Sequence, residues 1–253
     1  MPPAIWYPLQ LKEIIRETPG TSRFFFELES DDVLSYAPGQ FLTCDLPIGE
    51  KRAQRWRSYS IANRSNPENE IEFCISNKNG GLASSYFFNQ IAIGDRFKVK
   101  GPEGSFVLPE EESIRLFMIC TGTGMAPFRA MLQEIESKQL GYKAVHLIFG
   151  TRREEDILYR DEIEGWAETI PGFQADLCLS RMDSIPQGGS GKIRFHQGYV
   201  HQAYEAVLQE NDYPKSSCLF MICGWSAMID EAVAKLFQDR GFTREQIRYE
   251  LYG

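Results

Sequence analysis

The second half of the chain alternates apolar runs with amphipathic segments, a pattern that few folds can accommodate. From residue 115 onward, four runs have the composition of buried strands, namely RLFMICTG, AVHLIFG, FQADLCLS and CLFMICG. Each is followed by a segment with apolar residues at helical spacing: MAPFRAMLQEIESKQ, YRDEIEGWAETI, GYVHQAYEAVLQE and SAMIDEAVAKLFQDRG. Successive parallel strands need such crossovers, so the pattern predicts an α/β domain with a parallel, doubly wound sheet.

The first half follows a different pattern, in which Gly, Pro, Asn and Asp separate short apolar runs. The runs FFFEL, GQFLTCDL, RSYSIAN, IEFCIS and DRFKVKG are typical of an antiparallel β-barrel. One helix is expected within it, in LASSYFFNQI after Gly80 and Gly81. A chain of 253 residues has room for two domains, and we place them at residues 1–109 and 110–253.

Composition and charge narrow the possible functions. Apolar residues make up 43% of the chain and charged residues 25%, as in ordinary soluble proteins. No stretch approaches 18 apolar residues and no leader pattern opens the chain, so we expect a cytoplasmic protein without a membrane partner. The net charge is −8, with the acidic excess mainly in the second half, which argues against nucleic acid as a partner.

Two groups of residues bear on partners and metals. Lys51, Arg52, Arg55 and Arg57 form a basic cluster, which is either a solvated loop or a cationic rim for an acidic partner. The six cysteines lack the short spacings of iron–sulfur or zinc sites, so no metal site is expected. Most of these cysteines should be buried, reduced thiols, with Cys223 as the exception discussed below.

Both halves contain segments that could hold phosphate groups. Gly122 and Gly124 lie between a strand and a helix, where backbone amides can bind a pyrophosphate. Pro127 replaces the third glycine of the dinucleotide fingerprint, and the usual acidic residue after the next strand is missing, which disfavours an ordinary Rossmann dehydrogenase. In the first half, Arg57 and Tyr59 share one face of a strand, and NGGLASSYF opens a helix with glycines and serines.

A longer series of motifs carries a family resemblance. RSYS, GGLAS, GPEGSF, TGTGMAPFRAML, DILYRDE, LSR, CGWSAM and the terminal YELY occur in the order and spacing found in the ferredoxin–NADP reductase superfamily. The match covers nearly the whole chain, which therefore resembles these FAD- and NAD(P)-binding flavoprotein reductases. The resemblance implies a six-stranded antiparallel FAD-binding barrel, a five-stranded parallel NADP-binding domain, and catalysis at the crevice between them.

The resemblance assigns the flavin contacts to the first half. Arg57 would bind the FAD pyrophosphate, Tyr59 would pack on the isoalloxazine, and Ser60 would hydrogen-bond the reactive central nitrogen of the flavin. The remaining flavin contacts, which include those to phosphate and ribitol, are Ser58, Gly80, Gly81 and Ser84.

The resemblance also places the nicotinamide in the second half. Cys223 and Gly224 match the pair beside the nicotinamide, where small residues leave room for two stacked rings. Glu250 matches an active-site carboxylate that positions the nicotinamide and relays a proton, and Tyr252 matches a terminal tyrosine on the flavin face, followed here by Gly253. The turn that receives the nucleotide is formed by Thr121, Gly122, Thr123 and Gly124.

The choice of nucleotide rests on a few residues near the end of the third strand. Ser180 and Arg181 match the pair that holds the 2′-phosphate of NADPH, to which arginine offers bidentate donors. Tyr199 matches the tyrosine that flanks the adenine, and Arg152 is a further nucleotide contact. We therefore expect NADPH, with NADH as the alternative. Gln197 replaces a lysine common in the family, and the candidate substitutes are Lys192 and Arg194.

The expected function is that of an FAD-dependent reductase. It would exchange a hydride between NADPH and FAD and single electrons between FAD and a ferredoxin or flavodoxin, with Ser60, Cys223, Glu250 and Tyr252 as the catalytic residues. No cysteine-rich or haem segment is visible, so the acceptor is expected to be a separate polypeptide. The alternative is the NADH-dependent reductase component of an oxygenase or hydroxylase system. A non-catalytic flavoprotein would have no use for a nicotinamide pocket.

Overall fold

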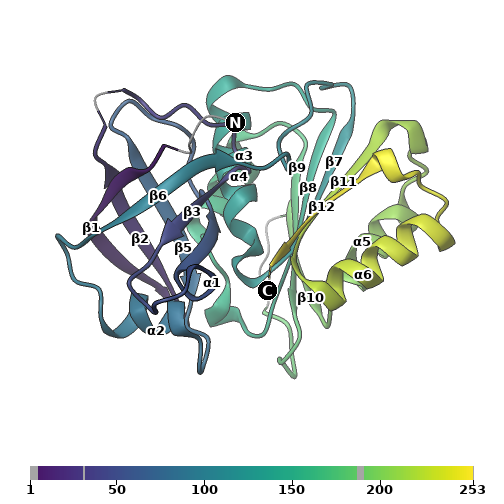
Figure 1. Ribbon diagram of the computed structural model, residues 1–253. Helices are drawn as coiled ribbons and strands as arrows, with labels where there is room; N and C mark the ends of the chain where they lie inside the picture. Colours follow the sequence, from purple (N-terminus) through teal and green to yellow (C-terminus); the bar gives the residue numbers. More distant parts are fainter. Residues whose placement is uncertain (1–4, 31, 187–190, 253) are drawn as a thin grey trace. The chain divides into compact units, whose positions relative to one another are not determined.

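The computed structural model describes residues 5–30, 32–186 and 191–252, which form two units (Figure 1). The N-terminal unit consists of the chain through Leu108 together with Ala126–Gln133. The C-terminal unit consists of Pro109–Met125 and the chain from Glu134 onward. Each unit has its own sheet and its own apolar core.

The N-terminal unit is built on a six-stranded antiparallel sheet with the strand order β4-β3-β6-β1-β2-β5, as predicted for this half. The strands are β1 (Tyr7–Thr18), β2 (Thr21–Leu28), β3 (Phe41–Asp45), β4 (Trp56–Ser60), β5 (Glu70–Ser76) and β6 (Arg96–Glu103). The helices are α1 (Arg52–Arg55) and α2 (Leu82–Asn89), of which the sequence predicted only α2.

The two outer strands of this sheet approach each other across the core. Tyr59 of β4 contacts Phe73 of β5 with ring centroids 5.5 Å apart, and the Ala62 amide donates to the Glu72 carbonyl at 2.9 Å. Among the described residues no strand ladder joins β4 to β5, so the sheet curls as a barrel does without closing through paired strands. Alternate residues of β2, such as Phe24, fill the interior.

The C-terminal unit contains a parallel sheet with the strand order β10-β9-β8-β7-β11-β12, which confirms the predicted doubly wound α/β fold. The strands are β7 (Arg115–Thr121), β8 (Ala144–Thr151), β9 (Phe173–Leu179), β10 (Ile193–Gln197), β11 (Cys218–Trp225) and β12 (Ile247–Tyr252). The helices are α3 (Met125–Lys138), α4 (Arg160–Thr169), α5 (Val200–Glu210) and α6 (Ser226–Ala234), which continues as a π-helical turn, Lys235–Asp239.

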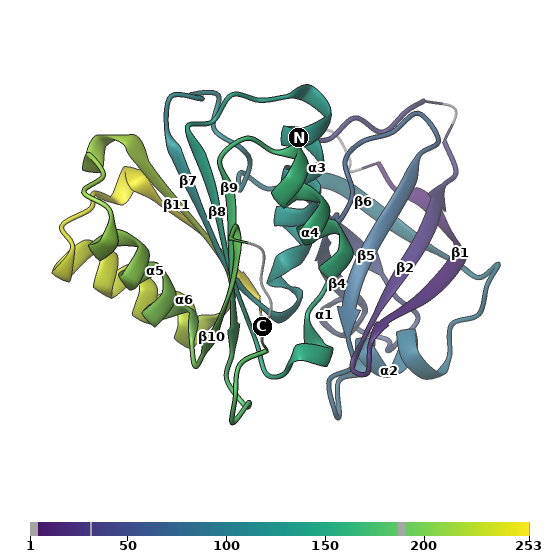
Figure 2. The ribbon, with the colours of Figure 1, turned by 180° about the vertical axis from the view of Figure 1, so that it is seen from behind.

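The helices of this unit cover both faces of its sheet, because the strands are apolar on both sides. Helices α5 and α6 pack on one face, and α4 lies on the other (Figures 1 and 2). The first face is filled by side chains such as Phe117 and Phe220 from the strands and Tyr204 from α5. This arrangement brings the carboxyl ends of the parallel strands to one edge of the sheet.

Strand β10 shows that the expectation of five parallel strands was wrong, since the sheet has six. It pairs in parallel with β9, where Arg194 lies opposite Asp176. The carboxylate of Asp176 is fully buried and accepts hydrogen bonds from Arg194 Nε at 2.8 Å and Nη2 at 3.1 Å, while His196 Nε2 lies 2.5 Å away. Ion pairs with β9, rather than a buried apolar face, therefore attach this edge strand to the sheet.

Candidate functional site

The residues predicted to contact the pyridine nucleotide follow directly on strand ends of the C-terminal unit. β7 ends at Thr121, β8 at Thr151, β9 at Leu179 and β11 at Trp225. Because these strands are parallel neighbours, the loops after them meet at one edge of the sheet, which is where open α/β folds bind ligands. The structure therefore brings the predicted nucleotide contacts of this unit together.

Two glycines at this edge are packed too closely to carry a side chain. A Cβ on Gly124 would lie 2.4 Å from the carbonyl oxygen of Cys223, and one on Gly224 would lie 2.4 Å from Thr121 Oγ1. Gly224 also has a φ of +146°, which side chains with a Cβ rarely adopt. Gly122, by contrast, has a φ of +52° and open space around it. The turn thus combines tight packing beneath with access from outside.

Thr121 supplies a further sign that this turn receives a ligand. Its hydroxyl is buried and has no hydrogen-bond partner among the described residues. Leaving a buried hydroxyl unsatisfied costs about 1–3 kcal/mol, so native structures rarely tolerate one without a reason. The orphaned hydroxyl fits a turn that completes its hydrogen bonds with a bound nucleotide.

Cys223, Glu250 and Tyr252 lie together on the neighbouring strands β11 and β12. Cys223 is fully buried and pairs in register with Glu250 on one side and Cys120 on the other. Burial raises the pKa of the Cys223 thiol well above its ordinary value, the charge of Glu250 raises it further, and a hydrogen bond with Tyr252 opposes them. The thiol is therefore protonated at neutral pH, and a steric role suits it better than a nucleophilic one.

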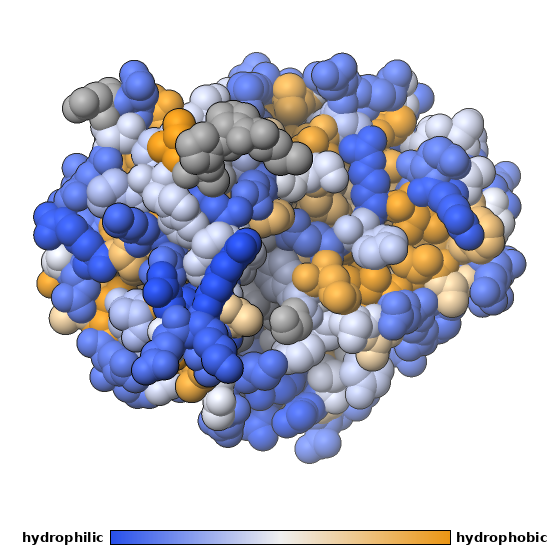
Figure 3. All heavy atoms as spheres, viewed as in Figure 1, coloured by the Kyte–Doolittle hydropathy of each residue, from blue (hydrophilic) through white to orange (hydrophobic). Residues whose placement is uncertain are grey.

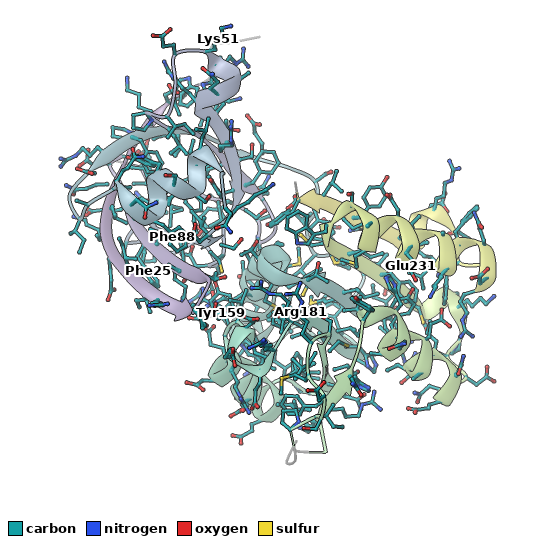
Figure 4. All side chains as sticks on the ribbon, turned by 90° about the horizontal axis from the view of Figure 1, so that it is seen from below. Phe25, Lys51, Phe88, Tyr159, Arg181 and Glu231 are labelled. Carbon is teal, nitrogen blue, oxygen red and sulfur yellow. The ribbon has the colours of Figure 1, made fainter. Side chains whose placement is uncertain are left out.

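Two arginines lie at the adjacent ends of β8 and β9. The Arg181 amide donates to the carbonyl of Arg152 at 2.8 Å, and the Ser180 hydroxyl donates to the Thr151 carbonyl at 3.2 Å. The Arg152 guanidinium lies 3.4 Å from Asp156, whereas Arg181 is exposed and has no carboxylate within 4.0 Å among the described residues (Figure 4). Of the two, Arg181 is the cation available to a phosphate.

The remaining nucleotide predictions divide into one exposed ring and two engaged cations. Tyr199 is 68% exposed at the start of α5, where its ring can stack on a planar base. The suggested substitutes for the family lysine bind elsewhere, which corrects that expectation. Lys192 Nζ donates to the Ala167 carbonyl at 2.6 Å, and the buried carboxylate of β9 holds Arg194.

In the N-terminal unit, β4 presents the predicted flavin contacts in the expected alternation. Arg57 and Tyr59 lie opposite the buried residues Cys44 and Leu42 of β3, so they share the face directed to the core. One nitrogen of Arg57, Nη1, donates to the Ala53 carbonyl at 3.0 Å and to the carbonyl of the preceding residue at 2.7 Å. The other guanidinium nitrogens are left for an anion, as pyrophosphate binding would require.

The start of α2 fits an anion less simply than the sequence suggested. Ser84 is buried, and its hydroxyl contacts the carbonyls of Lys78 at 2.8 Å and Gly81 at 3.1 Å. A hydroxyl proton donated there is not available to a phosphate, although the first amides of the helix are. Gly80, with a φ of +73°, lies exposed beside this turn. A contact between Ser84 and flavin phosphate stays a prediction, as do the other assigned roles.

The basic cluster of the N-terminal unit is partly neutralised. Arg55 forms a bidentate ion pair with Asp45, and Arg52 lies over the ring of Trp56 with 3.7 Å between its Cζ and the ring centroid. Lys51 is exposed at an outer corner of this unit (Figure 4). Lys51 and Arg52 are therefore the cations of the cluster most open to a partner.

An apolar surface lies elsewhere on the C-terminal unit. Apolar side chains gather over β12 and the adjoining part of α6 (Figure 3), and the exposed ones include Trp225, Phe237, Tyr249 and Leu251. A groove of about 240 Å³ there is lined by Ile229, Asp230, Val233, Ala234, Phe237, Gln238 and Tyr249. It contains none of the predicted site residues.

The described residues contain no group of three or more side chains suited to hold a metal ion. All six cysteines are buried and unpaired, as expected for five of them. Across the same residues, no helix combines the length and the apolar character needed to cross a membrane.

Comparison with known families assigns one domain to each half of the chain. Residues 8–108 match the oxidoreductase FAD-binding domain, and residues 118–234 match the oxidoreductase NAD-binding domain. NADH-cytochrome b5 reductase 1 of Laccaria bicolor is 30% identical over 231 residues, which cover 90% of this chain and 71% of that protein. Ferredoxin–NADP reductase B of Sorangium cellulosum is 28% identical over 242 residues, covering 93% of both chains.

Other relatives are longer than this chain. The electron transfer component of toluate 1,2-dioxygenase from Pseudomonas putida is 30% identical over 220 residues, which cover 87% of this chain but only 59% of that protein. Among solved structures, a ferredoxin–NADP⁺ reductase from Neisseria gonorrhoeae with bound FAD and NADP superposes with a TM-score of 0.78 at 22% identity, covering 97% of this chain and 98% of that one. At that identity the superposition shows the shared fold.

Proposed function

Because the chain belongs to the ferredoxin–NADP reductase superfamily of FAD-dependent oxidoreductases, we propose that it exchanges a hydride between NADPH and FAD and passes single electrons to a separate ferredoxin or flavodoxin. Bound FAD supplies the ability to take two electrons together and release them one at a time. The observation that carries the proposal is the gathering of the predicted nucleotide contacts at one edge of a sheet whose partner domain matches an FAD-binding model.

The residues of this chain would act by alignment rather than by acid–base chemistry. Gly124 and Gly224 keep the ends of β7 and β11 free of side chains, which leaves a flat space for a ring. Cys223, protonated and buried, closes that space from below, and Glu250 beside it would position the nicotinamide. Holding the reacting rings in one geometry accounts for several orders of magnitude in rate without a strong acid or base.

The test is an anaerobic titration of the purified protein with NADPH and with NADH, following the flavin absorption band. We expect bleaching with both nucleotides and faster bleaching with NADPH. Faster bleaching with NADH would favour the second candidate, the reductase component of an oxygenase system, which the similarity to a dioxygenase electron transfer component supports. A protein that holds no flavin after FAD is added would contradict the proposal.

Arg181 should set the preference for NADPH. Replacing it with methionine removes the available cation at the end of β9, and a charge-assisted hydrogen bond to phosphate contributes about 1.5–3 kcal/mol. We expect kcat/KM for NADPH to fall roughly 10- to 100-fold while the value for NADH changes little. Arg153→Met, on the same edge but 3.6 Å from Glu155, is the matched control. An equal loss with both nucleotides would remove Arg181 from phosphate recognition.

Lys51 and Arg52 should attract an acidic electron acceptor. Reversing both charges to glutamate is expected to raise the apparent KM for such an acceptor several-fold at low salt, and added salt should shrink the difference by screening. Reduction of a small dye should not change, because a dye needs no docking surface. Arg16→Glu, an exposed change on β1, is the control. Unaltered acceptor kinetics would show that the acceptor docks elsewhere.

A further inference from the structure

A buried ion network lies inside the N-terminal unit. Glu72 of β5 is 1% exposed and accepts hydrogen bonds from two arginines. Arg23 of β2 donates from Nε at 2.7 Å and from Nη2 at 3.1 Å. Arg129 of α3, itself 6% exposed, donates from Nη1 at 2.6 Å. Arg129 belongs to the segment of α3, Ala126–Gln133, that is part of this unit.

The network also engages the backbone that follows β4. Arg129 Nη1 donates to the Ala62 carbonyl at 2.9 Å, and the Glu72 amide donates to Asn63 Oδ1 at 2.8 Å. Glu17 lies 3.6 Å from Arg23 and balances the charge of the two arginines. Every charge of the group is thus compensated close by, which is the condition for burying ions in a protein.

Stability alone is a poor explanation for such a group. Well-packed apolar side chains of similar volume often stabilise a core as well as a buried ion network does. Charge-assisted hydrogen bonds, unlike apolar contacts, fix direction and register. Helix α3 already has an apolar contact in this unit, because the Phe128 and Phe106 rings lie 5.7 Å apart. The arginine adds a geometric constraint to that packing.

The constraint links two segments to which the proposed function assigns cofactors. Ala62 follows Ser60 by two residues on the strand predicted to contact the flavin. Arg129 follows Gly124 by five residues on the helix that starts at the predicted nucleotide turn. We propose, resting on that function, that Arg129 is a positioning residue for hydride transfer: by holding Glu72 and Ala62 it fixes α3, and with it the turn from which α3 begins.

The test compares two variants that disturb the same carboxylate. Arg129→Met removes the bonds from α3, whereas Arg23→Met removes the other arginine from Glu72 and leaves α3 bound. Both proteins are loaded with FAD, and their thermal unfolding and flavin content are measured. Stopped-flow reduction by saturating NADPH gives the limiting rate of the hydride step. Re-oxidation of the photochemically reduced flavin by ferricyanide gives a rate that needs no nicotinamide.

Arg129→Met is expected to lower the limiting rate of reduction about 10-fold or more, because small misplacements of reacting groups have effects of this size. Its ferricyanide rate and flavin content should stay close to those of the wild type. Arg23→Met should keep the limiting rate within about twofold, although both variants lose an ion pair to Glu72. Arg129→Lys, which keeps the charge but not the guanidinium, should restore part of the rate.

Equal limiting rates in the wild type and Arg129→Met, or equal losses in Arg129→Met and Arg23→Met, would overturn the positioning role while leaving the proposed function intact. A wild-type protein that holds FAD but is reduced by neither nucleotide would instead overturn the proposed function, and the positioning role with it. If Arg129→Met does not fold, Arg129→Lys and Arg23→Lys provide the same comparison, and equal limiting rates in that pair would overturn the positioning role.

Discussion

Alanine at position 224 is expected to slow the reduction of bound FAD by NADPH about 100-fold while leaving the FAD content unchanged. The new Cβ would lie 2.4 Å from Thr121 Oγ1, 3.1 Å from Met228 Cε and 3.2 Å from the Thr121 amide nitrogen. The backbone at Gly224, with a φ of +146°, also strains any residue other than glycine. The ends of β7 and β11 must separate to relieve these contacts, and a displacement of about 1 Å is enough for a loss of this size.

The measurement is the limiting rate in anaerobic stopped-flow reduction, together with flavin content and re-oxidation by ferricyanide. Gly165→Ala is the matched control, because Gly165 lies in α4 and a Cβ there meets nothing within 4 Å. That variant should keep the wild-type rate and gain slightly in stability, as alanine favours a helix over glycine by about 1 kcal/mol. A Gly224→Ala protein with the wild-type rate of reduction would show that the nicotinamide binds away from this strand end.

Long periodic segments of the sequence predicted their structures, whereas short charged ones did not. The alternation after residue 115 correctly predicted four buried strands and the helices α3 to α6, because both periods extend over many residues. Strand β10 was missed because its five residues are mostly half-exposed and its attachment depends on Asp176 across the sheet. Helix α1 was missed because four residues carry too little periodicity.

The same distinction applies to the candidate site. Residues next to strand ends, such as Arg181 and Gly224, could be placed at one edge because parallel strands end together. Hydrogen bonds between side chains could not be predicted. The bond between Arg129 and Glu72 spans 57 residues of sequence, and the carbonyl contacts of the Ser84 hydroxyl depend on how the turn before α2 folds. Such pairings follow from the three-dimensional fold rather than from local pattern.

A buried histidine gives the second large prediction. His146 of β8 is 2% exposed and stacks on Phe117, with ring centroids 4.9 Å apart and the planes 8° from parallel. Neither of its ring nitrogens has a hydrogen-bond partner among the described residues. Burial lowers the pKa of His146 to about 4, with the charges of Arg194 and Arg115 in the same direction and that of Asp176 opposing them. The folded protein therefore keeps this ring neutral through most of the acid range.

Stability should consequently fall as the pH decreases from about 6.5 towards 4, because the unfolded chain takes up a proton on His146 that the folded chain excludes. Each pH unit within this range corresponds to about 1.4 kcal/mol, so His146→Phe should gain about 2 kcal/mol on the wild type between pH 7 and pH 5. At pH 7 the variant should be at least as stable, since it removes two unsatisfied buried nitrogens. Urea unfolding at intervals of half a pH unit measures this difference. Tyr213→Phe, whose ring lies 6.1 Å from the histidine, should follow the wild-type curve. Parallel curves for the wild type and His146→Phe would mean that the folded protein protonates His146 as readily as the unfolded chain does.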